Sequence, residues 1–238
     1  MKQMITLTLV LFFLCEIVQV QAQKYVEVGG FIGFAGYQGD LTEDPIDFRE
    51  TKYSFGGFAT YHYNRKLNLR GQVYYGRISG ADANSTSKGL RNRDWSFTAD
   101  LIEASISAEW VPFAKSRFDK VGLFRPQINP YFTLGVGLTF ADKEIDYIHN
   151  PFNGVGEMIR FPEPLDQNNF FVIPVGAGLR LDFTQWTTIA GEFGFRYTQS
   201  DYVDGISIHA KNAGPDWYFF IGVTASTYFG QQEDYGLD

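Results

Sequence analysis

One group of residues in this chain has the types found in a hydrolytic active site. Ser207 and His209 lie two residues apart, and Asp201 and Asp204 precede them. In serine hydrolases and acyltransferases the imidazole takes the serine proton and a carboxylate orients the imidazole. Ser207 and His209 share a face on an extended segment, but this spacing does not define a triad. We therefore expect no catalytic residues and no enzyme activity.

Acidic and histidine side chains could also bind metal. Residues 40–47 carry carboxylates suited to calcium, but they lack the glycine and the ligand spacing of an EF-hand loop, so a solvated acidic loop is favoured. These carboxylates belong to Asp40, Glu43, Asp44 and Asp47. The histidines, which are not spaced as ligands with one another or with a cysteine, are His62, His149 and His209. We expect them at the surface or in loops, and we expect no metal and no cofactor.

The first 22 residues have the composition of an export signal. Lys2 precedes an apolar run that ends with small residues at Val20 and Ala22, which is typical of a secretory signal peptide cut after Ala22. A transmembrane anchor is the alternative, but Glu16 interrupts the run. The only cysteine, Cys15, would leave with the signal, so residues 23–238 are expected to form a single domain without thiols.

The composition favours strands and disfavours nucleic-acid binding. The sequence has 20 basic and 27 acidic residues, a net charge of −7, and an acidic exported protein is poorly suited to bind nucleic acid. Aromatic residues make up 17% of the chain, with 23 Phe and 14 Tyr beside 25 Gly. This mixture suits strands with aromatic ends and close backbone contacts.

Eight segments alternate with a period of two, which is the spacing of a strand. They are Lys24 to Tyr37, Tyr53 to Tyr63, Leu67 to Ser79, Ser96 to Trp110, Pro130 to Ala141, Phe170 to Phe183, Thr187 to Thr198 and Trp217 to Phe229. One row of each segment is apolar and free of charge, as in Phe171, Ile173 and Val175. The opposite rows contain the charged residues Glu27, Arg70, Glu103, Glu109, Arg180, Asp182, Glu192 and Arg196.

Two architectures fit this alternation. In a soluble sandwich the apolar rows face a packed core and the charged rows face water. In an outer-membrane barrel the apolar rows contact lipid, and the charges pair in a lumen that eight strands leave only wide enough for side chains. The connections favour the barrel, because the short turns 64–66 and 184–186 alternate with long polar loops. We predict an all-β fold, an eight-stranded antiparallel up-and-down transmembrane barrel with long outer loops.

The connection at residues 111–129 is an exception, because it is long yet falls on the side of the short turns. It combines aromatic and basic residues, which favour partner surfaces. These residues are Phe113, Lys115, Arg117, Phe118, Lys120, Phe124 and Arg125. A loop packed under its own barrel is the alternative, in which Glu233, Asp234 and Asp238 could satisfy its charges.

Four strings extend in order over the mature chain: EVGGFIGFAGYQGDL, GADANSTSKGLRNRDWSFTADLIEASISAEW, FRYTQSDYVDGIS and DWYFFIGVTAS. Their most specific residues are Tyr37, Gly39, Asp40, Leu41, Arg91, Arg93, Phe97, Leu101 to Glu103, Asp201, Tyr202, Asp204 and Ser207. In order and spacing the strings resemble the PorG-like family of outer-membrane proteins of Bacteroidota. The resemblance implies a barrel of the type IX secretion apparatus that associates with the periplasmic PorK/PorN ring and has no established catalytic residues. Where the family commonly has a second acidic residue after Asp204, this chain has Gly205.

Together with the predicted barrel, the resemblance implies a non-enzymatic subunit that anchors or docks the PorK/PorN ring at the outer membrane of a Gram-negative bacterium. Two other functions stay open: an outer-membrane barrel enzyme acting on lipid as an acyltransferase or esterase, and a free-standing structural or adhesive barrel. Capture of a ring partner supports docking, whereas its absence together with lipid turnover supports the enzyme. No small-molecule substrate is expected.

Overall fold

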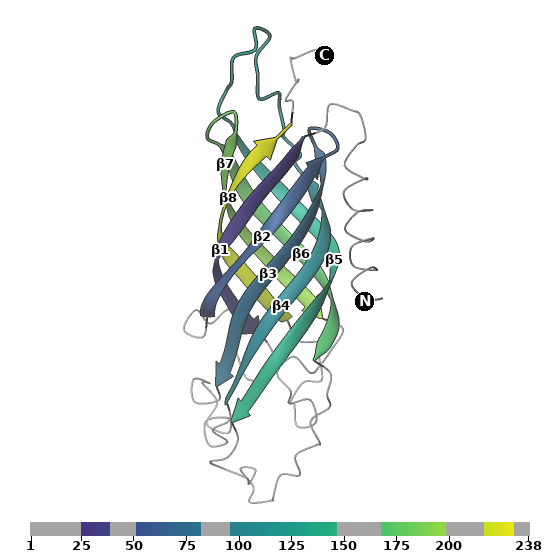
Figure 1. The fold of residues 1–238 in the computed structure, drawn as a ribbon, viewed down its shortest axis with the longest axis vertical. Helices are drawn as coiled ribbons and strands as arrows, with labels where there is room; N and C mark the ends of the chain where they lie inside the picture. The colour runs from purple at the N-terminus through teal and green to yellow at the C-terminus, as the bar shows by residue number, and fades with distance from the viewer. Residues whose placement is uncertain (1–24, 39–50, 82–95, 147–167, 199–216, 231–238) are drawn as a thin grey trace, which may run out of the picture.

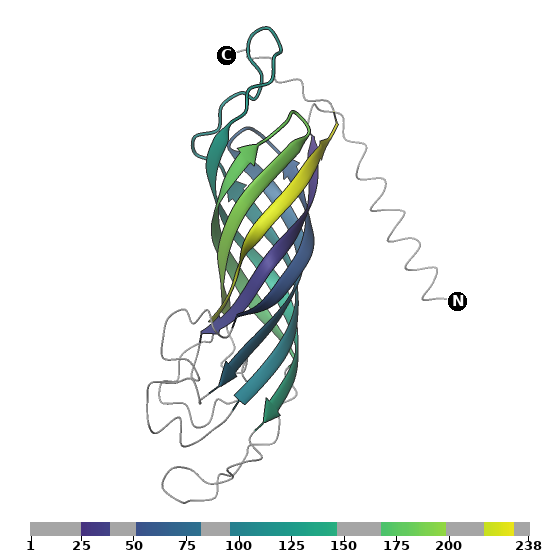
Figure 2. The ribbon, with the colours of Figure 1, turned by 90° about the vertical axis from the view of Figure 1, so that its left-hand side faces the viewer.

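The computed structural model describes residues 25–38, 51–81, 96–146, 168–198 and 217–230. They form eight strands: β1 (Val26–Gln38), β2 (Thr51–His62), β3 (Leu67–Ala81), β4 (Ser96–Trp110), β5 (Ile128–Asp146), β6 (Asn169–Asp182), β7 (Thr187–Thr198) and β8 (Trp217–Phe229). Each strand pairs with the next in antiparallel fashion, and β1 pairs with β8 (Figures 1 and 2). The predicted eight-stranded up-and-down barrel is therefore confirmed. Within the described ranges, no helix is long and apolar enough to cross a membrane.

The strand boundaries differ most from the prediction at β5. The sequence predicts a strand from Pro130 to Ala141, whereas β5 continues to Asp146. Its polar end lacks apolar alternation, but its backbone pairs with β4, where Thr98 lies opposite Glu144. Backbone hydrogen bonds with a neighbouring strand extend the ladder without an apolar row. Together with β3 and β4, this end of β5 reaches beyond the other strands, away from the short turns (Figure 1).

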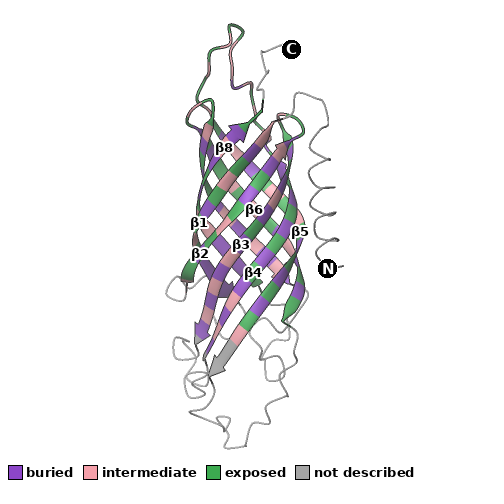
Figure 3. Cartoon of the chain, in the orientation of Figure 1, coloured by how far each residue is buried: buried purple, intermediate pink, exposed green. Residues whose placement is uncertain are grey.

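Exposure alternates along each strand, with the apolar row on the outside of the barrel (Figure 3). Leu69, Ile106 and Leu134 are 52%, 58% and 60% exposed. The predicted charged row lies inside, and each of its members is less than a tenth exposed. The soluble sandwich is therefore wrong, because a sandwich would bury the apolar row and expose the charges. A closed barrel with an apolar exterior satisfies its backbone hydrogen bonds internally and can face lipid.

One member of the predicted lipid-facing row of β8 is covered by other side chains. Phe219 is only 1% exposed. The rings of Phe193 and Phe195 lie 5.9 and 6.3 Å away, centroid to centroid. Phe219 also lies over Gly36, where an added Cβ would be 2.4 Å from the ring. The outer row of β8 is therefore not exposed at Phe219, because neighbouring aromatic rings on β7 cover it.

The lumen has an apolar half, which the sequence reasoning did not predict. The apolar half lies away from the short turns and consists of Phe31, Ala35, Tyr37, Tyr74, Ile78, Phe97, Ala99, Leu101, Ala141, Phe170, Val172, Tyr218 and Phe220. Its aromatic rings pack closely, with Phe31 stacked on Tyr74 at 4.6 Å and Phe220 meeting Tyr74 edge-on at 5.6 Å. These side chains fill the cross-section, as expected for a barrel of this size.

Close approach of β1 and β8 closes the barrel. Gly33 lies opposite Gly222. A Cβ added at Gly33 would lie 2.1 Å from the carbonyl oxygen of Ile221 and 2.6 Å from Cα of Gly222. Both contacts are with backbone, which cannot move away as a side chain can. The pair of glycines therefore lets the first and last strands approach each other inside the lumen.

Candidate functional site

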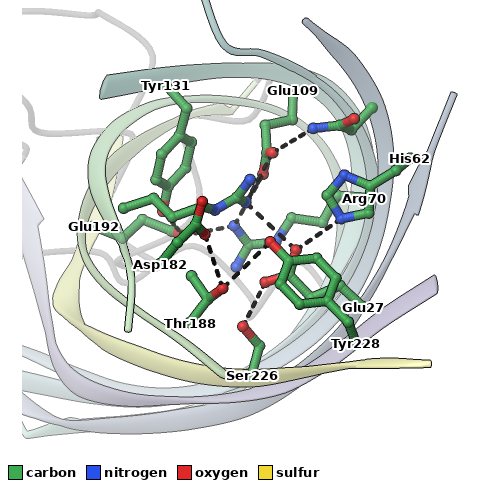
Figure 4. A network of polar contacts seen from close by, with 12 residues as sticks. Glu27, His62, Arg70, Glu109, Tyr131, Asp182, Thr188, Glu192, Ser226 and Tyr228 are labelled. Carbon is green, nitrogen blue, oxygen red and sulfur yellow. Dashed lines mark hydrogen bonds and ion pairs between the residues drawn. The ribbon is translucent and has the colours of Figure 1, made fainter. Parts of the chain in front are cut away.

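The half of the lumen beside the short turns is polar (Figure 4). We call this end of the barrel the turn side. Side chains from all eight strands meet there, because each occupies the inward position of its strand. The labelled members in Figure 4 are Glu27, His62, Arg70, Glu109, Tyr131, Asp182, Thr188, Glu192, Ser226 and Tyr228.

Arg70 is the central cation of this network. Its Nη1 donates to Oε2 of Glu192 at 2.6 Å, and its Nη2 donates to the hydroxyl of Tyr74 at 2.6 Å. Tyr131 donates a second hydrogen bond to Glu192 at 2.9 Å. The guanidinium also lies 4.0 Å from the ring centroid of Phe58. Arg70 and Glu192 therefore link β3 to β7 through the interior, and aromatic groups surround the pair.

Arg180 joins two carboxylates nearer the turn side. Its Nη2 donates to both oxygens of Glu109, at 2.8 and 3.0 Å, and lies 3.7 Å from Oε2 of Glu27. Asn68 donates to Glu109 at 2.9 Å. Such a pair satisfies charges that would be costly to bury alone.

His62 belongs to the same network, which the sequence reasoning missed. The expectation of a surface or loop position is wrong, because His62 is buried and its Nε2 lies 2.9 Å from Oε2 of Glu27. Ser226 donates to the other oxygen of Glu27. The signal was present in the sequence, since His62 is two residues from Thr60 on the inward row of β2. Histidine was considered as a metal ligand, but not as a partner for a lumen carboxylate.

A further ion pair lies among the apolar residues. Arg196 Nε donates to Glu103 at 3.0 Å, and its Nη1 donates to the carbonyl oxygen of Gly194 at 2.8 Å. Glu103 also accepts hydrogen bonds from Tyr218 at 2.8 Å and from Ser105 at 3.0 Å. Both members of this pair therefore have hydrogen-bond partners besides each other.

The arrangement of these groups supports stability. Every predicted lumen arginine binds a carboxylate, and the carboxylates accept further hydrogen bonds from hydroxyl or amide groups. Across the described ranges, no cluster of three or more His, Cys, Asp or Glu residues could hold a metal ion. The network therefore cross-links strands on opposite sides of the barrel and fills its polar half.

The connection between β4 and β5, residues 111–127, forms a hairpin that extends beyond the turn side (Figures 1 and 2). We call it the β4–β5 hairpin. Phe118 pairs with Phe124 in an antiparallel bridge, and their rings meet edge-on at 6.0 Å. At the tip, Asp119 accepts hydrogen bonds from the backbone amides of Val121 and Leu123 at 3.0 and 2.9 Å. Gly122 has a φ of 78°, which glycine adopts without strain.

The tip of the hairpin contains a charged pair, Asp119 and Arg125. The backbone amides of Leu123 and Val121, together with the guanidinium of Arg125, lower the pKa of Asp119 below its usual value. Arg125 Nη2 lies 3.3 Å from Asp119, but the Arg125 side chain is 69% exposed. The hairpin is thus held by specific hydrogen bonds while part of its charge stays accessible.

An open groove of about 850 Å³ lies along the hairpin and the start of β5. Its lining includes Phe113, Lys115, Lys120, Val121 and Ile128. Phe113 is 68% exposed and Val121 is 78% exposed, and both lysines are exposed. Five of the seven residues predicted to bind a partner line this groove: Phe113, Lys115, Phe118, Lys120 and Arg125.

Arg117 differs from the prediction, since the structure buries it. It is 8% exposed and its Nε lies 3.2 Å from Oδ2 of Asp182 inside the barrel mouth. The expectation that Arg117 faces a partner is therefore wrong. Phe124 is half-buried, and Arg117 lies 5.6 Å from its ring centroid. The sequence could not show this, because Arg117 and Asp182 meet only when β4, β5 and β6 are assembled.

Of the residues that carry the family resemblance, the structure describes Tyr37, Phe97 and Leu101 to Glu103. Tyr37 is buried at the end of β1 and meets Phe97, which is also buried, edge-on at 4.9 Å. Other predicted residues lie outside the described ranges: Gly39, Asp40, Leu41, Glu43, Asp44, Asp47, Arg91, Arg93, His149, Asp201, Tyr202, Asp204, Ser207, His209, Glu233, Asp234 and Asp238. The expected signal peptide, residues 1–22, lies outside them as well.

Comparisons with known proteins give one family and several distant structures. Similar solved structures include a major outer membrane protein from Thermus thermophilus, with 13% identity, a TM-score of 0.46, and coverage of 88% of this chain and 100% of that chain. The N-terminal β-barrel domain of OprF from Pseudomonas aeruginosa has 12% identity, a TM-score of 0.45, and coverage of 88% and 100%. No curated protein matches the sequence. Residues 5–237 match a family described as a domain of unknown function, DUF6089, and the chain therefore belongs to the DUF6089 family.

Proposed function

We propose that this chain is a non-enzymatic outer-membrane barrel of the type IX secretion apparatus, and that it docks the periplasmic PorK/PorN ring through the β4–β5 hairpin. The closed barrel with an apolar exterior is an architecture suited to the bacterial outer membrane. The resemblance of the sequence strings to the PorG-like family supports the choice of apparatus. The filled lumen supports a role in attachment over a role as a general pore.

The β4–β5 hairpin is the observation that carries this proposal. A two- to five-residue turn is enough to connect neighbouring strands, and the turn after Phe183 shows this in the same barrel. The hairpin is instead built with its own bridge, its own tip hydrogen bonds and a groove. Long ordered connections of this kind usually have a function.

The surface chemistry of the hairpin suits a protein partner. The whole chain has a net charge of −7, whereas residues 111–127 carry four basic residues and one acidic residue. Exposed Phe113, Val121 and Leu123 lie beside Lys115 and Lys120. Apolar anchors next to basic groups are typical of the core and rim of an interface. The hairpin therefore offers a basic, apolar docking surface on the periplasmic side of an acidic protein.

Replacement of residues 113–125 by a short Gly/Ser turn tests the proposal directly. The shortened barrel should stay in the outer membrane and keep its heat-modifiable migration, because the strands and the lumen network at Arg70 and Arg196 are unchanged. Co-purification of PorK and PorN should be lost. Capture of the ring at wild-type yield would place the docking surface elsewhere.

A charge-reversal variant tests the basic surface of the hairpin without changing the length of the hairpin. Lys115→Glu combined with Lys120→Glu should weaken ring capture about tenfold or more, with greater weakening at low salt. Lys66→Glu is the matched control, since Lys66 is exposed in the neighbouring turn between β2 and β3. The purified protein in lipid vesicles is assayed for lipid turnover, which tests the enzyme alternative. Turnover of lipid without ring capture would favour the enzyme alternative.

A further inference from the structure

One basic residue of the β4–β5 hairpin enters the barrel. Arg117 Nε lies 3.2 Å from Oδ2 of Asp182, at the end of β6. Its Nη2 donates to the carbonyl oxygen of Thr184 at 3.1 Å. Its guanidinium carbon lies 4.0 Å from the ring centroid of Tyr228 on β8. A single side chain of the hairpin therefore contacts two strand ends that are distant from it in sequence.

The partners of Arg117 are themselves fixed. Thr188 lies 3.2 Å from Asp182 and 3.3 Å from the hydroxyl of Tyr228. These contacts orient the carboxylate and the ring that receive the guanidinium. The planar guanidinium suits such a site, because it can pair with a carboxylate and stack on an aromatic ring at the same time.

The other charged groups of the hairpin differ from Arg117 in burial. Lys115, Lys120 and Arg125 are exposed, whereas Arg117 is 8% exposed. The bridge between Phe118 and Phe124 and the tip at Asp119 hold the hairpin together internally. Arg117 instead connects the hairpin to the barrel. The same residue is one of those that line a cavity of about 40 Å³ at the turn-side mouth.

We propose that Arg117 is a latch, a positioning residue that holds the β4–β5 hairpin against the mouth of the barrel. With Arg117 bound to Asp182 and Tyr228, the groove on the hairpin keeps one orientation relative to the membrane. When the contact is broken, the hairpin opens as a unit and its tip becomes mobile. The consequence for docking rests on the proposed function. If the partner binds the latched hairpin, opening the hairpin lowers the affinity, because part of the binding energy is then spent on ordering the hairpin.

The latch can be tested on the purified full chain in phosphatidylcholine nanodiscs, without any partner. Trypsin cleavage after Lys120 under native conditions reports the open population of the hairpin. Arg117→Ala should raise the rate of cleavage after Lys120 about tenfold or more. Arg117→Lys keeps the positive charge but loses the planar guanidinium, so its cleavage rate should lie between those of Arg117→Ala and the wild type. Lys66→Ala is the matched control, because it removes an exposed basic side chain from the neighbouring turn and leaves the hairpin unchanged, and its rate of cleavage after Lys120 should stay within about twofold of wild type.

A second variant shows whether Arg117→Ala acts through the contact with Asp182 or through a general loss of stability. Asp182→Asn should raise cleavage in the same way as Arg117→Ala, and the double variant should exceed neither single variant by more than about twofold, because both remove one contact. Heat-modifiable migration of the uncleaved protein should be retained throughout. Wild-type cleavage in both Arg117→Ala and Asp182→Asn, or additive effects of the two, would overturn the latch.

Ring capture by the same variants separates the latch from the docking role. If Arg117→Ala opens the hairpin and lowers the affinity for the PorK/PorN ring, the latch positions the docking surface. If the hairpin opens and ring capture is unchanged, the latch stands and its part in docking is refuted. Failure of the hairpin replacement to affect capture would refute the proposed function while the cleavage result for Arg117 remained valid.

Discussion

Arg196 offers the sharpest test of the lumen as a folding core. It is 2% exposed and donates from Nε to Glu103 at 3.0 Å, while Glu103 is fully buried. Replacement by alanine removes the only basic group paired with Glu103 among the described residues. Glu103 would then keep hydrogen bonds from Tyr218 and Ser105, but no cation.

The expected loss follows from the burial of this pair. Removal of one partner leaves a buried, uncompensated charge and typically costs about 3–5 kcal/mol. Arg196 also lies 4.6 Å from the ring centroid of Phe220, so the alanine leaves a gap beside the aromatic core. In Arg196→Met with Glu103→Gln both charges are absent, and most of the stability should return. The comparison separates the uncompensated charge from the lost volume.

The assay is urea unfolding of the barrel in lipid vesicles, followed by tryptophan fluorescence and by heat-modifiable migration. With a slope of about 2 kcal/mol/M, a loss of about 4 kcal/mol lowers the midpoint by about 2 M. Arg77→Ala is the matched control, since Arg77 lies 3.6 Å from Asp100 in a pair whose side chains are 37% and 40% exposed. An exposed pair contributes less than about 1 kcal/mol. Equal midpoint shifts for Arg196→Ala and Arg77→Ala would refute the assignment of the lumen pair as a stabilising core.

Three further predictions concern the backbone, the hairpin tip and the exterior. Gly33→Val should prevent closure of β1 on β8 and abolish heat-modifiable migration, whereas Gly71→Val, with no atom within 4 Å of its added Cβ, should fold normally. The pKa of Asp119 is lowered in the folded hairpin, so its contribution to the tip is present above the usual aspartate pKa of about 3.9 and is lost as pH falls below it. Amide exchange at Leu123 should therefore accelerate, after correction for the intrinsic rate, as the pH falls below about 4, and Asp119→Asn should remove this dependence. The protein should extract only with detergent, and recovery from the aqueous fraction as a monomer would contradict the lipid-facing exterior.

Much of the fold could be predicted because the period of two is a local property. Alternation places Leu69 and Arg70 on opposite faces of β3, and β2 departs from this alternation at the register shift between Thr51 and Ser54. The direction of these faces required the closed sheet, since a sandwich and a barrel show the same rows. The buried aromatic contacts of Phe219 also required the assembled strands, because the rings that cover it belong to β7.

The candidate site could be predicted in part. The sequence indicated that the hairpin between β4 and β5 was unusual, and Phe113 and Lys120 are indeed exposed on its groove. It placed Arg117 on the same surface, whereas the structure buries Arg117. Hairpin residues have no strand parity to orient them, so their direction depends on what the assembled barrel offers. Asp182 and Tyr228 supply that environment from distant segments.

The sequence by itself determined the strands, the separation of charged rows from apolar rows and the position of the exceptional connection, because each depends on the order of neighbouring residues. The tertiary structure decided which charges meet. Arg70 binds Glu192, which lies 122 residues away on a strand across the lumen. His62 meets Glu27, and Arg117 meets Asp182, through the stagger of closed strands. Parity fixes the face of a side chain, whereas closure and stagger fix its height in the barrel, and only groups at the same height can pair.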